Sequence, residues 1–142
     1  MRFTLKLSLP RDAQTVPAAR HIAMSAMDEI GVAGETSQDI AVALTEACTN
    51  VLLHSGPGDE YEVSLDVDDA DCVISIIDSG HGFDASALGL MHAEMSAERG
   101  RGIELMRALV DQVRFVSKPE SGTVVRLEKR VEFADGSLAR RA

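Results

Sequence analysis

The order of the expected elements predicts an α+β fold, a two-layer sandwich in which helices cover one face of a mixed sheet. Strands and helices come in runs, whereas a doubly wound sheet needs their regular alternation. Hydrophobic residues make up 45% of the chain and charged residues 26%, which is the balance of a folded protein. A chain of 142 residues fits a single domain, residues 1–142, with a real core.

Each expected element has its own signal. In order, the elements are a strand at 3–9, helices ending at 30 and 54, strands at 60–67 and 72–78, a helix at 103–109, and strands at 113–117 and 123–131.

The first strand and helix are marked by alternation and by capping residues. Apolar and polar residues alternate over 3–9, which is typical of a half-buried strand, and Pro10 ends it. Asp12 or Thr15 is expected to cap the helix that follows. Gly31 is expected to end that helix, since glycine readily adopts the left-handed conformation found after helix ends.

The second helix is expected to be capped by Thr36 or Ser37 and to run to about His54. A turn rich in glycine and proline then leads into two β-rich runs, 60–67 and 72–78, which an acidic turn joins.

The second half of the chain contains a long glycine-broken segment, residues 79–102. Loops of this length in a small domain are usually functional or act as lids. A short helix at 103–109 follows, then a hairpin formed by 113–117 and 123–131. The last residues, 134–142, are expected to form a frayed tail.

The charge balance narrows the possible ligands. Acidic residues number 23 and basic residues 14, a formal net charge of −9. Such a surface repels phosphate backbones, so direct binding of nucleic acid is not expected. A single nucleotide could still bind if positive charge were concentrated locally.

The cysteines and the hydropathy pattern predict a cytoplasmic protein. Cys48 and Cys72 form no CxxC motif and are expected to be core residues of a protein in a reducing compartment. The N-terminal residues lack a signal-peptide core, and no stretch approaches the roughly 20 apolar residues of a membrane span.

A polar stripe on the second helix is the first candidate for chemistry. The core face of this helix is predicted from the spacing of Ile40, Leu44 and Val51, and Glu46 and Asn50 lie about a quarter-turn away, one turn apart. A carboxylate can accept a proton, and an amide oxygen can bind Mg²⁺. The alternative is an ordinary solvated helix face.

The second candidate is the end of the strand 72–78. A carboxylate there, Asp78, could accept hydrogen bonds from a planar donor such as the adenine amino group. Gly80 and Gly82 follow and would let the backbone approach a ligand closely. An ordinary Asp-Gly turn is the alternative. A dinucleotide-binding loop is less favoured, because that motif belongs after the first strand of a βαβ unit.

The third candidate is the segment Arg99–Ile103, in which Gly100 and Gly102 flank Arg101. A glycine loop that opens a helix directs free N–H groups and a positive dipole end at an anion. Residues 99–118 contain five basic and two acidic residues, which reverses the sign of the overall charge. The alternative is a flexible loop with solubilising arginines.

The motifs in chain order are Glu46-x-x-x-Asn50, Asp78-x-Gly80-x-Gly82, Gly100-Arg101-Gly102 and Gly122-Thr123. Together they resemble the motifs of the GHKL (Bergerat-fold) ATPases. The strings LTEACTNVLLH, IDSGHGFD, GRGIELM and GTVVRLEK are similar to those of the bacterial anti-sigma-factor serine/threonine kinases within that family. The resemblance covers about residues 5–129.

The resemblance implies a role for each matching position. Glu46 would be the general base that activates a substrate serine hydroxyl. Asn50 would coordinate the Mg²⁺ ion that bridges the ATP phosphates, and Asp78 would bind the adenine amino group. The other positions would shape the adenine pocket, support it, or hold the phosphates beneath a lid at 84–99: Gly80, Gly82, Thr123, Gly100, Arg101 and Gly102.

The resemblance also implies a function. Such kinases silence an alternative sigma factor and phosphorylate a small anti-sigma-factor antagonist, so that partners are exchanged, and they usually work as homodimers. The alternative is a nucleotide-binding regulatory module that sequesters a protein partner without phosphoryl transfer.

Overall fold

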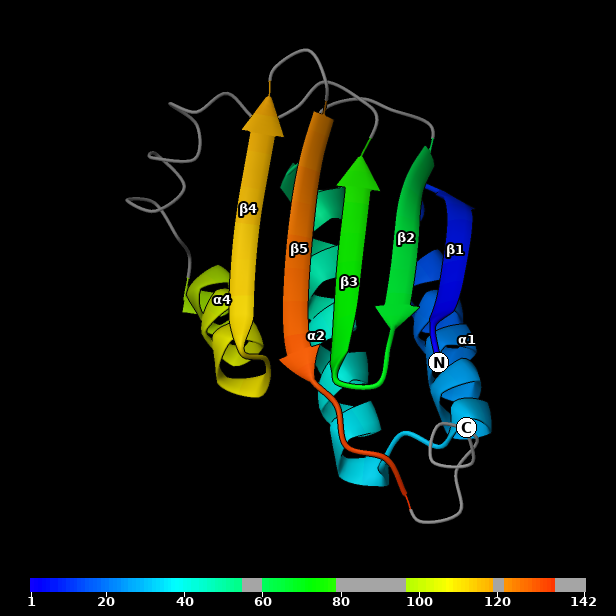
Figure 1. The fold of residues 1–142 in the computed structure, drawn as a ribbon. Coiled ribbons are helices and arrows are strands. Elements are labelled where there is room, and N and C mark those ends of the chain that lie inside the picture. Colours follow the sequence, from blue (N-terminus) through cyan, green and yellow to red (C-terminus); the bar gives the residue numbers. More distant parts are fainter. Residues whose placement is uncertain (55–59, 79–96, 119–121, 135–142) are drawn as a thin grey trace.

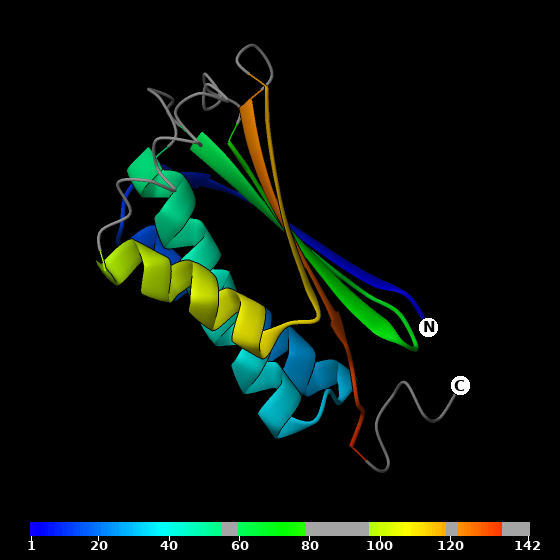
Figure 2. The same cartoon turned by 90° about the vertical axis from the view of Figure 1, so that its left-hand side faces the viewer.

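The chain forms two layers, a five-stranded sheet of order β1-β2-β3-β5-β4 (Figure 1) and helices that cover one of its faces (Figure 2). The computed structural model describes residues 1–54, 60–78, 97–118 and 122–134. The strands are β1 (Phe3–Pro10), β2 (Glu60–Val67), β3 (Asp71–Asp78), β4 (Gln112–Lys118) and β5 (Gly122–Arg130), and the helices are α1 (Thr15–Ile30), α2 (Gly34–His54) and α4 (Ala97–Leu109). The α+β class and the one-sided helical layer are confirmed.

The sheet differs from the mixed sheet expected, because each pairing between these strands is antiparallel. Helix α4 connects β3 to β4 as a crossover, and these two strands point the same way because both are antiparallel to β5. They are not neighbours, however. Strand β5 returns from β4 and lies between them, so each neighbouring pair becomes antiparallel.

The core lies between the sheet and the helices. Burial alternates along β3 and, apart from the buried Ser64, along β2, so every second side chain faces the helical layer. On α2 the predicted apolar face is fully buried, with Ile40, Leu44 and Val51 each 0% exposed. Cys48 and Cys72 are buried in this core, where desolvation raises the pKa of each thiol to about 12. Both therefore stay protonated and serve as small apolar residues, as predicted.

The predicted N-caps of α1 and α2 were both wrong, because local hydrogen bonds start each helix at another residue. Helix α1 has Gln14 at its N-cap position, and its backbone N–H donates to the Asp12 carboxylate at 2.9 Å. Helix α2 begins at Gly34, earlier than predicted, because the Ser37 N–H donates to the Ala33 carbonyl at 2.9 Å. The helix end at Gly31 is confirmed, since Gly31 is left-handed with φ 90°.

The segment after β5 packs against the turn between α1 and α2. Phe133 forms a bridge with Val32, the Ala33 N–H donates to the Glu132 carbonyl at 2.8 Å, and the Ala134 N–H donates to the Gly31 carbonyl at 2.8 Å. Ala134, the first residue of the predicted tail, is thus held in place, and 135–142 lie outside the described residues. The described helices include none that is long and apolar enough to span a membrane.

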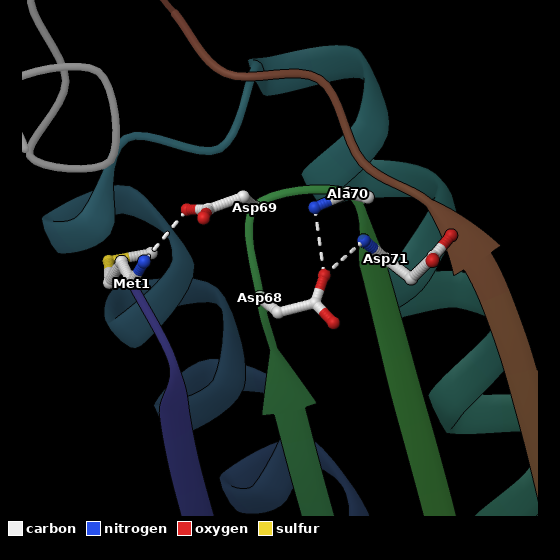
Figure 3. Close-up of polar contacts among 5 residues, drawn as sticks. All are labelled: Met1, Asp68, Asp69, Ala70 and Asp71. Carbon is white, nitrogen blue, oxygen red and sulfur yellow. Dashed lines mark hydrogen bonds and ion pairs between the residues drawn. The ribbon is translucent and has the colours of Figure 1, made fainter.

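Hydrogen bonds between a side chain and the backbone of the acidic turn hold the turn between β2 and β3 in place (Figure 3). One oxygen of the Asp68 carboxylate accepts hydrogen bonds from the N–H groups of Ala70 at 2.8 Å and Asp71 at 2.7 Å. These two bonds lower the pKa of Asp68, because they favour its charged form. The neighbouring Asp69 pairs with the Met1 ammonium group at 2.9 Å.

Replacing Gly31 by alanine is expected to lower the free energy of unfolding by about 1–2 kcal/mol, since a left-handed conformation places a Cβ against the following carbonyl. Urea unfolding followed by circular dichroism measures this. Gly34→Ala is the matched control, because a Cβ there meets nothing within 4 Å. Equal losses in both variants would contradict the role of the left-handed turn.

The charge of Asp68 is expected to stabilise the β2–β3 turn only while the carboxyl group is ionised. Because its folded pKa is lowered, this stability is present above the unfolded pKa and is lost as the pH falls through the folded pKa. The difference in unfolding free energy between the wild type and Asp68→Asn should therefore be larger at neutral pH than in acid. A difference that stays constant with pH would contradict this.

Candidate functional site

Asp78 is the most deeply buried polar residue at the candidate site. It ends β3, its side chain is 0% exposed, and it lies in register with Tyr61 of β2 on one side and Thr123 of β5 on the other. The predicted strand-end carboxylate is therefore buried inside the protein, at the end of the central strand of the sheet. A buried carboxylate is costly unless charged or hydrogen-bonding groups face it.

The cation that faces Asp78 comes from the turn after β1. Nη1 of Arg11 lies 3.2 Å from Oδ2 of Asp78, and Nη2 donates to the Leu52 carbonyl at 3.3 Å. The Arg11 side chain is only 11% exposed. One guanidinium thus connects the ends of β1, β3 and α2, which lie together at one end of the molecule (Figure 1).

No pattern in the sequence predicts this role for Arg11. Its only local signal is an arginine that follows a strand-ending proline. The contact depends on the register of three strands, because Leu9 of β1 pairs with Tyr61 of β2, which in turn pairs with Asp78. Neither of these pairings follows from the sequence near Arg11.

The turn that carries Arg11 is fixed by hydrogen bonds on both sides. The Asp12 N–H donates to the Pro10 carbonyl at 2.8 Å, and the Thr15 hydroxyl donates to the Asp12 carbonyl at 2.6 Å. The same hydroxyl lies 2.6 Å from the hydroxyl of Tyr61. Burial raises the pKa of Tyr61, and the hydrogen bond with Thr15 partly offsets that rise.

Glu46 and Asn50 are half-buried on α2, next to its core face, as the periodicity predicted. Glu46 points at α4. A Cβ built on Gly102 would lie 2.9 Å from Oε2 of Glu46, which is closer than real side chains allow. The structure therefore brings together two motifs that are far apart in the sequence, and the glycine leaves the room that the carboxylate occupies.

The second glycine motif is not a loop in front of a helix, so that prediction is wrong. Helix α4 begins at Ala97 rather than Ile103, and Gly100, Arg101 and Gly102 all lie inside it. Within α4, only the N–H groups of residues 97–99 lack partners in the helix, because the first helical hydrogen bond is donated by its fourth residue, Gly100.

The structure describes the side chains of two of the five basic residues in 99–118, Arg107 and Arg114, and these two lie on different elements. Arg107 is exposed on α4, whereas Arg114 lies on β4, between Val113 and Phe115, which pack against the core. Because successive side chains of a strand point to opposite faces, Arg114 lies on the face that the helices leave open.

Several predicted positions are described only in part. Gly80, Gly82 and the part of the predicted lid at 84–96 lie outside the described residues. The remainder of that lid, 97–99, forms the start of α4. Thr123 is placed by its backbone alone, as the register partner of Asp78 on β5.

The described residues thus supply three kinds of group near the ends of α2, β3 and α4. Asp78 is a buried acceptor, Asn50 offers a neutral oxygen, and Glu46 offers a carboxylate beside helix α4. Oxygen donors of this kind suit Mg²⁺, which takes few protein ligands and prefers phosphates and water for the rest. The chemistry of these donors is compatible with a magnesium-nucleotide complex.

Comparison with known proteins agrees with this geometry. The family model of the histidine kinase-like ATPase domain matches residues 9–129. An anti-sigma F factor of Pasteuria penetrans is 31% identical over 106 residues, which cover 69% of this chain and 71% of that protein. A serine-protein kinase RsbW of Halalkalibacterium halodurans is 27% identical over 135 residues, which cover 89% of this chain and 82% of that protein.

Solved structures support the same fold. A crystal structure of RsbU and RsbW domains from Mycobacterium tuberculosis matches 91% of this chain with a TM-score of 0.69 and 21% identity, and this chain spans 32% of it. The histidine kinase domain of a blue-light activated histidine kinase from Erythrobacter litoralis matches 89% of this chain and 67% of its own length, with a TM-score of 0.51 and 17% identity. The sequence match and the shared fold together establish that the chain belongs to the histidine kinase-like ATPase domain family.

Proposed function

We propose that this protein is an ATP-dependent serine-protein kinase that also acts as an anti-sigma factor in the cytoplasm. The observation that carries the proposal is the placement of Glu46, one turn from Asn50 on α2 and against Gly102 of α4. A protein that only binds nucleotide has no need of a carboxylate at this position. The relatives named as a serine-protein kinase and as an anti-sigma F factor support the same function.

The nucleotide is held at both ends. Asp78 accepts a hydrogen bond from the adenine amino group, and Gly80, Gly82 and Thr123 line and support the adenine pocket. At the other end, Asn50 contributes its amide oxygen to a Mg²⁺ ion, which when bound neutralises charge on the phosphates. The glycine motif at the start of α4 holds the phosphates. Gly100, Arg101 and Gly102 can donate their N–H groups to the phosphates only if the first turn of α4 opens.

Glu46 acts as the general base. It takes the proton of a serine hydroxyl on the protein substrate while the serine oxygen forms a bond to the γ-phosphorus of ATP. The bond between that phosphorus and the bridging oxygen breaks, and ADP leaves. Phosphoryl transfer of this kind depends mainly on positioning and charge neutralisation. The structural reason for Gly102 is then that any larger residue would displace the base.

The protein partners follow from the same proposal. The substrate is an antagonist of the anti-sigma factor, and its phosphorylation on serine ends its ability to compete for the kinase. The kinase is then free to bind and silence a sigma factor. The acidic surface, with a net charge of −9, suits binding to proteins rather than to nucleic acid.

Replacing Glu46 by glutamine is expected to slow phosphate transfer by about 100-fold or more, because a positioned general base contributes that much. The measurement is transfer of radiolabelled phosphate from Mg-ATP to the purified antagonist protein. ATP affinity, measured by calorimetry, should change little. Chelation of magnesium should stop transfer in the wild type.

Glu35→Gln is the matched control, since Glu35 lies in the first turn of the same helix at its opposite end. Its transfer rate should equal that of the wild type. Transfer by Glu46→Gln at the wild-type rate would refute the assignment of the base. Tight binding of Mg-ATP by the wild type without any transfer would instead favour a regulatory module that only binds nucleotide.

Replacing Gly102 by alanine is expected to displace the Glu46 carboxylate, because the new Cβ would lie 2.9 Å from Oε2. Misplacing a reacting group by about 1 Å can cost roughly 100-fold in rate. Transfer should therefore fall in the wild-type background. In the Glu46→Gln background the same change should cost much less, since the two effects share one contact. Additive losses in the double variant would contradict the proposed contact.

A further inference from the structure

We infer that Arg11 is the positioning residue that fixes the adenine-binding carboxylate and thereby sets the preference of the site for adenine. The inference deepens the proposed function and rests on it, since it takes Asp78 as the acceptor of the base. It assigns a role in nucleotide selection to the turn between β1 and α1, which contains none of the motifs that mark the site in the sequence.

The first argument is the geometry of the guanidinium. One of its nitrogens lies 3.2 Å from Oδ2 of Asp78 and another donates to the Leu52 carbonyl at 3.3 Å. The guanidinium is planar and rigid, so two anchors on different elements fix its plane. The carboxylate that it faces is thereby held in one orientation, relative to both the sheet and the last turn of α2.

The second argument is that Arg11 is itself preorganised. Its turn is closed by the Asp12 N–H and the Pro10 carbonyl at 2.8 Å. The hydroxyls of Thr15 and Tyr61 lie 2.6 Å apart and join the start of α1 to β2. Tyr61 is also the register partner of Asp78. The arginine and the carboxylate therefore belong to one rigid unit, which is what a precise binding geometry requires.

The third argument is burial. Asp78 is 0% exposed, and the side chain of Arg11 is 11% exposed. Removing one partner of a buried ion pair leaves an uncompensated charge, which is strongly unfavourable. A carboxylate has about four acceptor positions, so pairing with Arg11 is compatible with binding an amino group. A buried carboxylate that accepts a hydrogen bond from an amino group disfavours a base that carries an oxygen acceptor at the same position. Two buried acceptors would then face each other without a hydrogen between them.

The test compares two nucleotides that differ at that one position. ATP carries a 6-amino group, and inosine triphosphate carries a 6-oxo group. Dissociation constants for both are measured by calorimetry on the full chain, for the wild type, Arg11→Met, Arg11→Lys and Asp78→Asn. Thermal unfolding of each variant is recorded in parallel. Arg2→Met is the matched control, because Arg2 is 79% exposed and only approaches Asp66, at 4.0 Å.

The wild type should bind ATP more tightly than inosine triphosphate, and Asp78→Asn should abolish that preference. Arg11→Met should reduce the preference by about tenfold or more, because it removes the charged partner of a buried carboxylate. Arg11→Lys should keep the charge and recover part of the preference, but it lacks the second anchor on Leu52. Arg2→Met should behave as the wild type.

The outcomes separate the inference from the proposed function. If Asp78→Asn abolishes the preference while both Arg11 variants keep it within about twofold, Arg11 has no part in selection and the inference is wrong, although the proposed function stands. If Arg11→Met lowers the thermal midpoint and weakens both nucleotides equally, its role is merely structural and the inference is again wrong. If the wild type binds neither nucleotide, the proposed function and the inference fail together. Should Arg11→Met not fold, the preference of Arg11→Lys decides between the first two outcomes.

Discussion

The packing of α2 against the sheet sets the geometry of this protein. Ile40, Leu44 and Val51 are fully buried on one face of this helix, and burying side chains of this size contributes roughly 1.5–3 kcal/mol each. Once that face is buried, the rotation of the helix about its axis is fixed. The polar stripe that carries Glu46 and Asn50 must then lie at the side, where α4 packs.

The candidate site inherits its geometry from this packing and from the ends of the strands. Asp78 lies where β3 ends, Arg11 where β1 has ended, and Leu52 in the last turn of α2. These three residues lie in separate parts of the chain, yet the guanidinium of Arg11 contacts both Asp78 and Leu52. The site is therefore as rigid as the sheet and α2, whereas the predicted phosphate-binding side depends on α4 and on residues 79–96, outside the described part of the chain.

Acidic side chains have different structural roles at different places in this protein. The acidic β2–β3 turn uses the Asp68 carboxylate to satisfy two of its own N–H groups, which makes it a structural feature. Asp78 is likewise an acid, but its burial opposite Arg11 gives it a fixed orientation that an exposed carboxylate lacks. Neither the net charge of −9 nor the basic excess of residues 99–118 distinguishes these two situations.

Local sequence patterns were enough to predict most of the elements, the α+β class, the buried face of α2 and the polar residues beside it. Such features follow from local periodicity and from turn residues such as Gly31, which the sequence displays directly. Three features emerged only from the three-dimensional fold: the antiparallel described pairings of the sheet, the start of α4 at Ala97, and the contact between Arg11 and Asp78. They were not predictable because strand order, helix–helix packing and the pairing of buried charges join residues far apart in the chain. Local propensity carries no information about such pairs.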